Sequence, residues 1–181
     1  MPLLARPGRV ARALAIALPL TAAGLGAQGP RATVVLPGYR GVVVLDTVGL
    51  TRAVPGTTGA LFAAVRGALD SLRIPVALAD SARGLLGNLE WTGARRFAGQ
   101  PMARWIDCGI GPSGPTANAY RIHLALLATI VAGGGRPTVH VALAAGAQAF
   151  SGPLGDPIAC QSTGRLEELL LAAAEARRPA P

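Results

Sequence analysis

The clearest alternation of apolar and polar residues lies between residues 120 and 148. In Tyr120–Val131, one face carries Ile122, Leu124, Leu126 and Ile130, and the other carries Arg121, His123 and Thr129. Thr138–Gln148 alternates in the same way, with Val139, Val141 and Leu143 opposed to Thr138 and His140. A period of two is the pattern of a strand with one buried face. The glycine-rich stretch Ala132–Pro137 joins the two segments, so together they predict a β-hairpin.

Two other stretches repeat their apolar residues at helical spacing. The first follows a turn at Pro55–Thr58 and carries Leu61, Phe62, Val65, Leu69 and Leu72. The second carries Leu166, Leu169, Leu170 and Ala173, with Glu167 and Glu168 in its first turn and Arg177 and Arg178 in its last. Acidic residues at the start of a helix and basic residues at its end match the helix dipole. Both stretches are therefore predicted to be helices.

Shorter apolar runs predict the remaining strands. Gly41–Val48 is a β-branched run, which is typical of a strand. Ile74–Asp80 and Leu85–Gly99 flank a turn at Asp80–Gly84 and predict a second hairpin, whose first strand begins at a proline. Gly109–Ala119 is rich in glycine and proline and predicts a loop.

The order strand, helix, hairpin, hairpin, helix predicts an α+β fold. We expect a two-layer sandwich in which an antiparallel sheet of about four to five strands carries two helices on one face. A small, strongly curved sheet that grips one helix is the alternative. We expect one domain over residues 41–178, after an extended lead-in at residues 28–40 and before a disordered tail at residues 179–181.

The N-terminus has the three-part layout of a secretory signal peptide. Three arginines among the first twelve residues precede the apolar run Ala13–Leu20, and a stretch of small residues follows it up to Ala27. The apolar run is shorter than the roughly 20 residues that cross a membrane, and Pro19 argues against a continuous helix. We therefore expect a signal peptide at residues 1–27, cleavage near Ala27, export to the periplasm or the extracellular space, and no transmembrane segment in the mature chain.

Loss of this segment changes the charge. The chain carries a net charge of +8, and removing the three arginines of the signal leaves 8 − 3 = +5. All basic residues are arginine. A basic exported protein is attracted to anionic lipid, acidic polysaccharide or stray nucleic acid by general electrostatics, which indicates no specific nucleic-acid partner. The pattern carries no signal for an oligomeric state.

The two cysteines, Cys108 and Cys160, are 52 positions apart, and in an exported chain they predict a disulfide. A metal site is the less favoured reading, because neither cysteine has another cysteine or a histidine within four residues. A thiol nucleophile would need His123 or His140 brought to it by the fold. We expect no metal and no cofactor.

The sequence supplies no catalytic constellation. Pairing the hairpin about its glycine loop sets His140 opposite Thr129 and His123 opposite Gly146, so the histidines lie roughly 20 Å apart on the polar face. Gly-Ile-Gly at residues 109–111 is followed by prolines rather than by the helix that a dinucleotide site needs. No GxSxG motif is present, and the acids are scattered, at Asp46, Asp80, Glu90 and Asp107. No catalytic residue is therefore predicted.

One cluster has the composition of an interaction surface. Within fifteen positions the chain places Trp91, Arg95, Arg96, Phe97, Arg104 and Trp105. Arginine beside exposed aromatic residues is typical of binding surfaces. In the alternative interpretation, the aromatic residues belong to the core and the arginines only face outward. If the cluster is exposed, Trp91, Arg95, Arg96, Arg104 and Trp105 are the partner-binding residues, and the partner is an envelope protein or an anionic glycan.

The stretch Ala60–Gly87 carries a family resemblance. Its apolar helix, turn and strand, with the D-x-x-x-G element at Asp80–Gly84, resembles small exported bacterial domains such as those of the C lipoprotein of the outer-membrane β-barrel assembly machinery. The resemblance implies a two-layer α+β domain with a scaffolding or binding role. This chain departs from that family, since it has no lipobox cysteine and has its own cysteine pair.

Two hypotheses on function follow. The favoured one is an exported, non-enzymatic domain that binds a cell-envelope partner. The alternative is a small exported hydrolase-type enzyme that uses His123 or His140 with a nearby acid.

Overall fold

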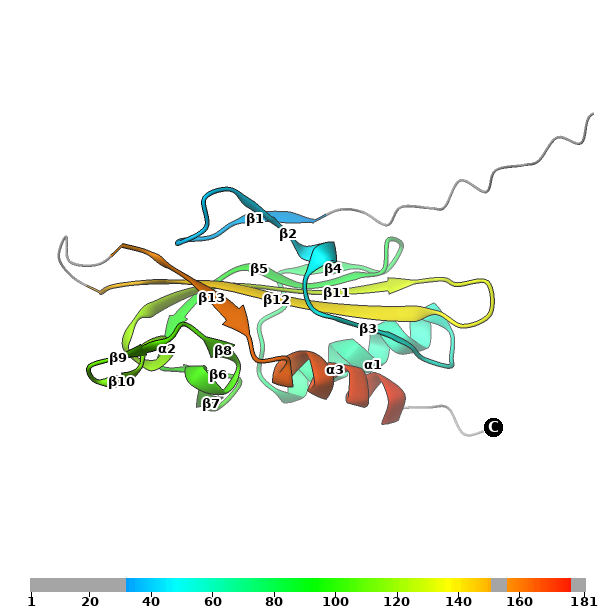
Figure 1. Ribbon diagram of the computed structural model, residues 1–181. Helices are drawn as coiled ribbons and strands as arrows, with labels where there is room; N and C mark the ends of the chain where they lie inside the picture. Colours follow the sequence, from blue (N-terminus) through cyan, green and yellow to red (C-terminus); the bar gives the residue numbers. More distant parts are fainter. Residues whose placement is uncertain (1–31, 151–155, 177–181) are drawn as a thin grey trace, which may run out of the picture.

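The computed structural model describes residues 32–150 and 156–176, and its centre is an antiparallel sheet of seven strands (Figure 1). Six of the strands follow one another in the order β4 (Leu78–Asp80), β5 (Leu85–Ala94), β11 (Arg121–Val131), β12 (Thr138–Gln148), β13 (Ile158–Ser162) and β8 (Ile106–Asp107). The seventh, β3 (Leu50–Ala53), pairs with β12 beside β13. The outer edge of β12 is therefore shared by two strands, and the sheet forks there.

The predicted fold class is wrong. Strands make up about 43% and helices about 26% of the described residues, so the protein is β-rich rather than an α+β sandwich of four to five strands. The prediction missed β3, β8 and β13, which have four, two and five residues. Strands this short show no alternation of their own and are held by pairing with a longer neighbour. The predicted strand Gly41–Val48 instead forms β2 (Val42–Val44), which lies outside this sheet.

The central hairpin has the predicted register. β11 and β12 pair along their whole length, with Thr129 opposite His140 and His123 opposite Gly146. The β4–β5 hairpin is also formed, and β5 bulges opposite β11 between Asn88 and Trp91. The alternating apolar residues of β11 and β12 line the main core, as the pattern predicts.

Two long helices cover one face of the sheet (Figure 1). α1 (Thr58–Ser71) begins at the N-cap Thr57, whose side chain accepts a hydrogen bond from the Ala60 amide at 3.2 Å. α3 (Arg165–Ala176) packs beside it. The buried stripe of α3 differs from the predicted one: Glu167 and Leu171 are buried, whereas Leu169 is exposed. Arg177 and Arg178 lie outside the described residues.

The other face of the sheet is covered by a small hairpin and not left open. β1 (Thr33–Val35) lies within the predicted lead-in and pairs with β2, and a short 3-10 helix η1 (Leu45–Thr47) follows. Leu36, Val43 and Leu45 pack on the sheet in a second core. The hairpin loop touches the sheet where Gly146 leaves room, because a Cβ there would lie 2.1 Å from the Pro37 carbonyl oxygen.

A lobe between β5 and β11 completes the molecule. It holds β6 (Arg96–Phe97), β7 (Gln100–Pro101), the 3-10 helix η2 (Met102–Arg104), β9 (Ile110–Gly111), β10 (Gly114–Pro115) and the short helix α2 (Thr116–Ala119). The predicted loop Gly109–Ala119 is thus a small hairpin with a helical turn. The predicted disulfide between Cys108 and Cys160 is formed and ties the lobe to β13.

The predicted signal peptide at residues 1–27 and the tail at residues 179–181 lie outside the described part of the chain. Within residues 32–150 and 156–176, no helix is long and apolar enough to cross a membrane.

Candidate functional site

A hollow lies at the fork of the sheet, between β3, η2 and the start of α3. Its volume is about 530 Å³, and its lining residues are Leu50, Arg104, Trp105, Thr163, Gly164, Arg165, Glu168 and Leu169. Thr163 joins two of these elements, because its hydroxyl donates to the Arg104 carbonyl at 2.8 Å and its amide donates to the Trp105 carbonyl at 2.9 Å. Hydrogen bonds from the hydroxyl and the amide of Thr163 therefore hold this wall of the hollow together.

The predicted cluster divides into a buried aromatic part and an exposed basic part. Trp105 and Phe97 are 2% and 4% exposed, and the indole N–H of Trp105 donates to the Phe97 carbonyl at 2.8 Å. Trp91 is half-buried and meets Phe97 edge to face at 4.7 Å between ring centroids. These contacts place the aromatic side chains in or against the core, so they do not form an exposed aromatic surface.

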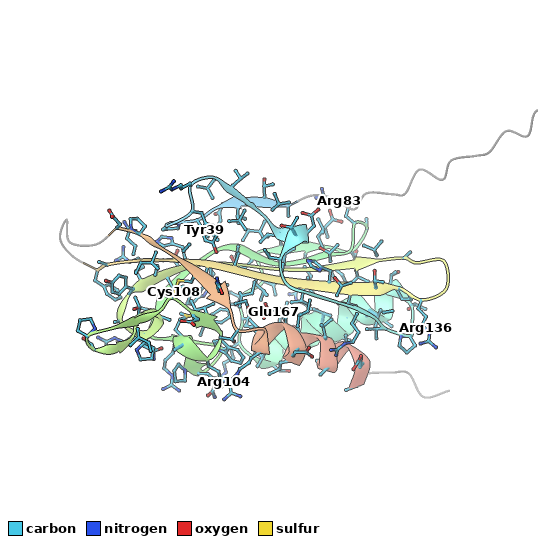
Figure 2. All side chains as sticks on the ribbon, viewed as in Figure 1. Tyr39, Arg83, Arg104, Cys108, Arg136 and Glu167 are labelled. Atoms are coloured by element: carbon cyan, nitrogen blue, oxygen red, sulfur yellow. A yellow bond between two sulfur atoms is a disulfide. The ribbon has the colours of Figure 1, made fainter. Side chains whose placement is uncertain are left out.

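The arginines of the cluster face solvent. Arg95, Arg96 and Arg104 are exposed, and Figure 2 shows Arg104 at the outer side of the lobe, away from the sheet. The Arg104 guanidinium lies over the Trp105 ring at 5.4 Å from its centroid, and that of Arg96 donates to the Gly99 carbonyl at 2.6 Å. Arg104 lines the hollow together with Arg165, a residue that the cluster did not include.

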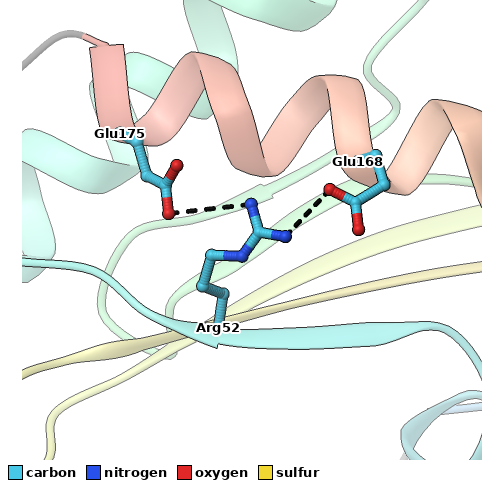
Figure 3. A network of polar contacts seen from close by, with 3 residues as sticks. All are labelled: Arg52, Glu168 and Glu175. Atoms are coloured by element: carbon cyan, nitrogen blue, oxygen red, sulfur yellow. Dashed lines mark hydrogen bonds and ion pairs between the residues drawn. The ribbon is translucent and has the colours of Figure 1, made fainter.

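The lining of the hollow carries more positive than negative charge, with two arginines and one glutamate. Among the described residues, Arg104 and Arg165 form no ion pair. Glu168, the one acid of the lining, is already engaged: the Arg52 guanidinium reaches it at 2.8 Å and reaches Glu175 at 3.6 Å (Figure 3). Since Arg52 occupies Glu168, two arginine side chains remain available to an anion.

A buried acid fixes the backbone at the start of α3. The Gly164 amide donates to the Ser162 hydroxyl at 3.0 Å, and that hydroxyl donates to Oε1 of Glu167. Oε2 of Glu167 has no partner, and the residue is 1% exposed. Burial raises the pKa of this carboxyl, and the hydrogen bond from Ser162 only partly opposes the effect. These two hydrogen bonds connect the buried carboxyl group of Glu167, through Ser162, to Gly164 in the lining of the hollow.

His140 has both ring nitrogens engaged. Its Nε2 lies 3.1 Å from the Leu45 carbonyl oxygen and its Nδ1 lies 2.8 Å from the Thr51 hydroxyl. Because a carbonyl only accepts, Nε2 carries a proton and donates it to the Leu45 carbonyl, while Nδ1 shares a hydrogen bond with the Thr51 hydroxyl. A hollow of about 210 Å³ adjoins the ring and includes Asp46 and Thr129 in its lining. Both ring nitrogens of His140 are therefore occupied by protein groups, and neither is free to contact a ligand in the adjoining hollow.

His123 lies beneath the β1–β2 hairpin. Its Nδ1 is 3.4 Å from the Thr92 hydroxyl, and its Nε2 is buried without a hydrogen-bond partner. A hollow of about 190 Å³ is lined by both His123 and Glu90, yet no hydrogen bond joins the two side chains. Since Nε2 is shielded from solvent, this imidazole is poorly placed to exchange protons with a substrate.

Two of the scattered acids are engaged within their own turns. Asp80 accepts from Arg83 at 2.6 Å within its turn, and Asp107 accepts from the Gly109 amide at 2.8 Å. Within the described residues, no three side chains of histidine, cysteine, aspartate or glutamate come together as a metal site.

Comparison with known proteins adds no family. No protein-family model and no curated protein matches the chain. The resemblance of Ala60–Gly87 to exported α+β domains is untested by these comparisons, and a function has to be inferred from the site itself.

Of the residues that line this hollow, the sequence patterns identified only Arg104 and Trp105 as binding candidates. Thr163, Gly164 and Arg165 stand more than fifty positions after Arg104, with no motif to connect the two segments. The signal that was available is local: Gly164 stands two positions before Leu166, where the helical stripe begins. That pattern marks a helix start but does not show which segment lies opposite it.

Proposed function

We propose that this protein is an exported, non-enzymatic domain that binds an anionic glycan of the cell envelope through the hollow at the fork of the sheet. The observation that carries the proposal is the pair Arg104 and Arg165, two exposed guanidinium groups that line one hollow and have no carboxylate partner among residues 32–150 and 156–176. Guanidinium groups bind carboxylate and phosphate oxygens in pairs of parallel hydrogen bonds.

The burial of the aromatic residues favours a glycan over an envelope protein. Protein interfaces are anchored by aromatic side chains that fill pockets on the partner. Trp105 and Phe97 are buried, so the exposed side chains that the predicted cluster offers to a partner are mainly its arginines. A charged and strongly hydrated partner suits such a surface better than an apolar protein surface does.

The states of the histidines support a binding role rather than the hydrolase alternative. A general base needs a free nitrogen within reach of its substrate. In His140 both nitrogens are engaged, and in His123 one nitrogen is shielded.

Export is part of the same proposal. The disulfide between Cys108 and Cys160 is compatible with an oxidising compartment, where such bonds persist. The signal peptide proposed at residues 1–27 would direct the chain there. The mass of the protein recovered from the exported fraction tests this part: it should correspond to a chain that starts near Gln28.

Binding is tested by titrating the mature protein with polygalacturonate, an acidic polysaccharide, and with dextran as the neutral control. Substituting Ser at Arg104 and Arg165 should weaken binding at least tenfold, because each lost ionic hydrogen bond contributes about 1.5–3 kcal/mol. The matched control substitutes Ser at Arg40 and Arg136, which are also exposed and unpaired within the described residues. It removes the same charge elsewhere on the molecule and should bind nearly as wild type does.

Equal losses in the two double variants would show attraction by net charge alone and contradict a site at the hollow. Binding to polyglutamate but not to polygalacturonate would show that the partner is an acidic protein rather than a glycan. Absence of binding to either polyanion would overturn the proposal.

A further inference from the structure

Arg95 occupies a backbone position that normally belongs to glycine. Its φ of 64° lies in the left-handed region, and Ala98, three residues later, has a φ of 49°. Residues other than glycine and asparagine adopt this backbone conformation at a cost in free energy, because their Cβ atom approaches the backbone carbonyl oxygen. The left-handed turn ends β5 and directs the chain into the β6–β7 hairpin. The fold thus keeps an arginine where glycine would be more stable.

This arginine is placed beside the wall of the hollow. The Arg95 carbonyl accepts a hydrogen bond from the Met102 amide at 2.8 Å, and Met102 begins the 3-10 helix that ends at Arg104. Arg96 follows it directly, with its guanidinium held on the Gly99 carbonyl. Neither Arg95 nor Arg96 lines the hollow itself. Within the described residues, neither forms an ion pair.

We infer that the glycan is a chain of several acidic sugars, which extends from the hollow to the β6–β7 hairpin and contacts Arg95 there. This inference rests on the proposed function and deepens it. A single acidic sugar suffices to engage Arg104 and Arg165 in the hollow. Only a longer polyanion also reaches the guanidinium groups outside it.

Chain length and one substitution test the inference together. Galacturonate and its octamer are titrated into wild type and into R95G, with R95N as a second uncharged variant that tolerates the left-handed backbone. The octamer should bind wild type at least tenfold more tightly than the monomer does. Both variants should bind the octamer about five- to tenfold more weakly than wild type, with little change for the monomer.

The melting temperature distinguishes ligand contact from a structural role of Arg95, because the loss of a structural contact would lower it. R95G should melt about 2–4 °C above wild type, because glycine relieves the left-handed backbone. Arg73, with a φ of 55° at the end of α1, is the control for this relief: R73G should show the same rise. The charge control for binding is R136S, which should bind the octamer as wild type does.

The outcomes separate the two proposals. Tighter octamer binding that both Arg95 variants weaken supports the inference. Equal affinity for monomer and octamer, or unchanged octamer binding by R95G and R95N, overturns the extended ligand and leaves the hollow as a site for a single acidic sugar. Absence of binding by wild type at either length overturns the proposed function as well.

Discussion

Ionisation of Glu167 should weaken the fold. One of its carboxyl oxygens is bonded to Ser162, the other has no partner, and the residue is 1% exposed. Burial raises its pKa in the folded protein above the ordinary value of 4.5. The folded state therefore holds this proton more tightly than the unfolded chain does. The resulting stabilisation is fully present below about pH 4.5 and is lost as the pH rises through the raised pKa.

Replacing Glu167 with Gln keeps the size of the side chain and removes the ionisation. A buried polar group left unpaired costs about 1–3 kcal/mol, and more when it is charged. The amide of Gln also lacks a partner, but its cost does not change with pH. We therefore expect the free energy of unfolding of E167Q, relative to wild type, to rise by about 1–3 kcal/mol from about pH 4 to about pH 8.

The assay is chemical denaturation at several pH values with the disulfide intact. Glu90 is exposed, so E90Q removes a negative charge without changing the core and serves as the control. A free-energy difference between E167Q and wild type that stays constant with pH, or falls as the pH rises, would contradict an unpaired, buried Glu167 carboxylate. It would mean that the second carboxylate oxygen finds a partner in solution.

Three further substitutions test the fold. Replacing Cys108 and Cys160 with Ser should cost about 4 kcal/mol of stability, as expected for opening a loop of this size, and the denaturation midpoint measures it. Gly146→Ala should destabilise by about 2 kcal/mol or more, since its Cβ would lie 2.1 Å from a carbonyl of the β1–β2 loop, whereas Gly134→Ala, with open space around it, should be tolerated. Thr57→Ala should cost about 1 kcal/mol through loss of the α1 cap, and an unchanged melting temperature would contradict that role.

Local patterns were sufficient for the long elements. The alternation in Tyr120–Val131 and Thr138–Gln148 determined both strands, and the glycine loop between them determined their register. The same reasoning failed for β3 and β13, because each is too short to show a period and gains its stability from β12. The number of strands in the sheet was therefore underestimated.

Patterns also missed features that depend on contacts between distant segments. The helical spacing located α3 correctly but assigned Leu169 to the core in place of Glu167, since an acid is expected to face water. The hydroxyl of Ser162, from the preceding strand, accounts for part of that burial. Likewise the cluster of Trp105 and Arg104 was visible in the sequence, but its division into a buried ring and an exposed guanidinium is a property of the folded lobe.

The central claim is that an acidic glycan binds at the fork of the sheet. A titration of isotopically labelled protein with octagalacturonate, followed by the shifts of backbone amide and arginine side-chain resonances, tests it most directly. We predict that the largest shifts fall on Gly164, Arg165 and Arg104, with no comparable change at His123 or His140. Shifts centred on either histidine, or spread evenly over all exposed arginines, would contradict it.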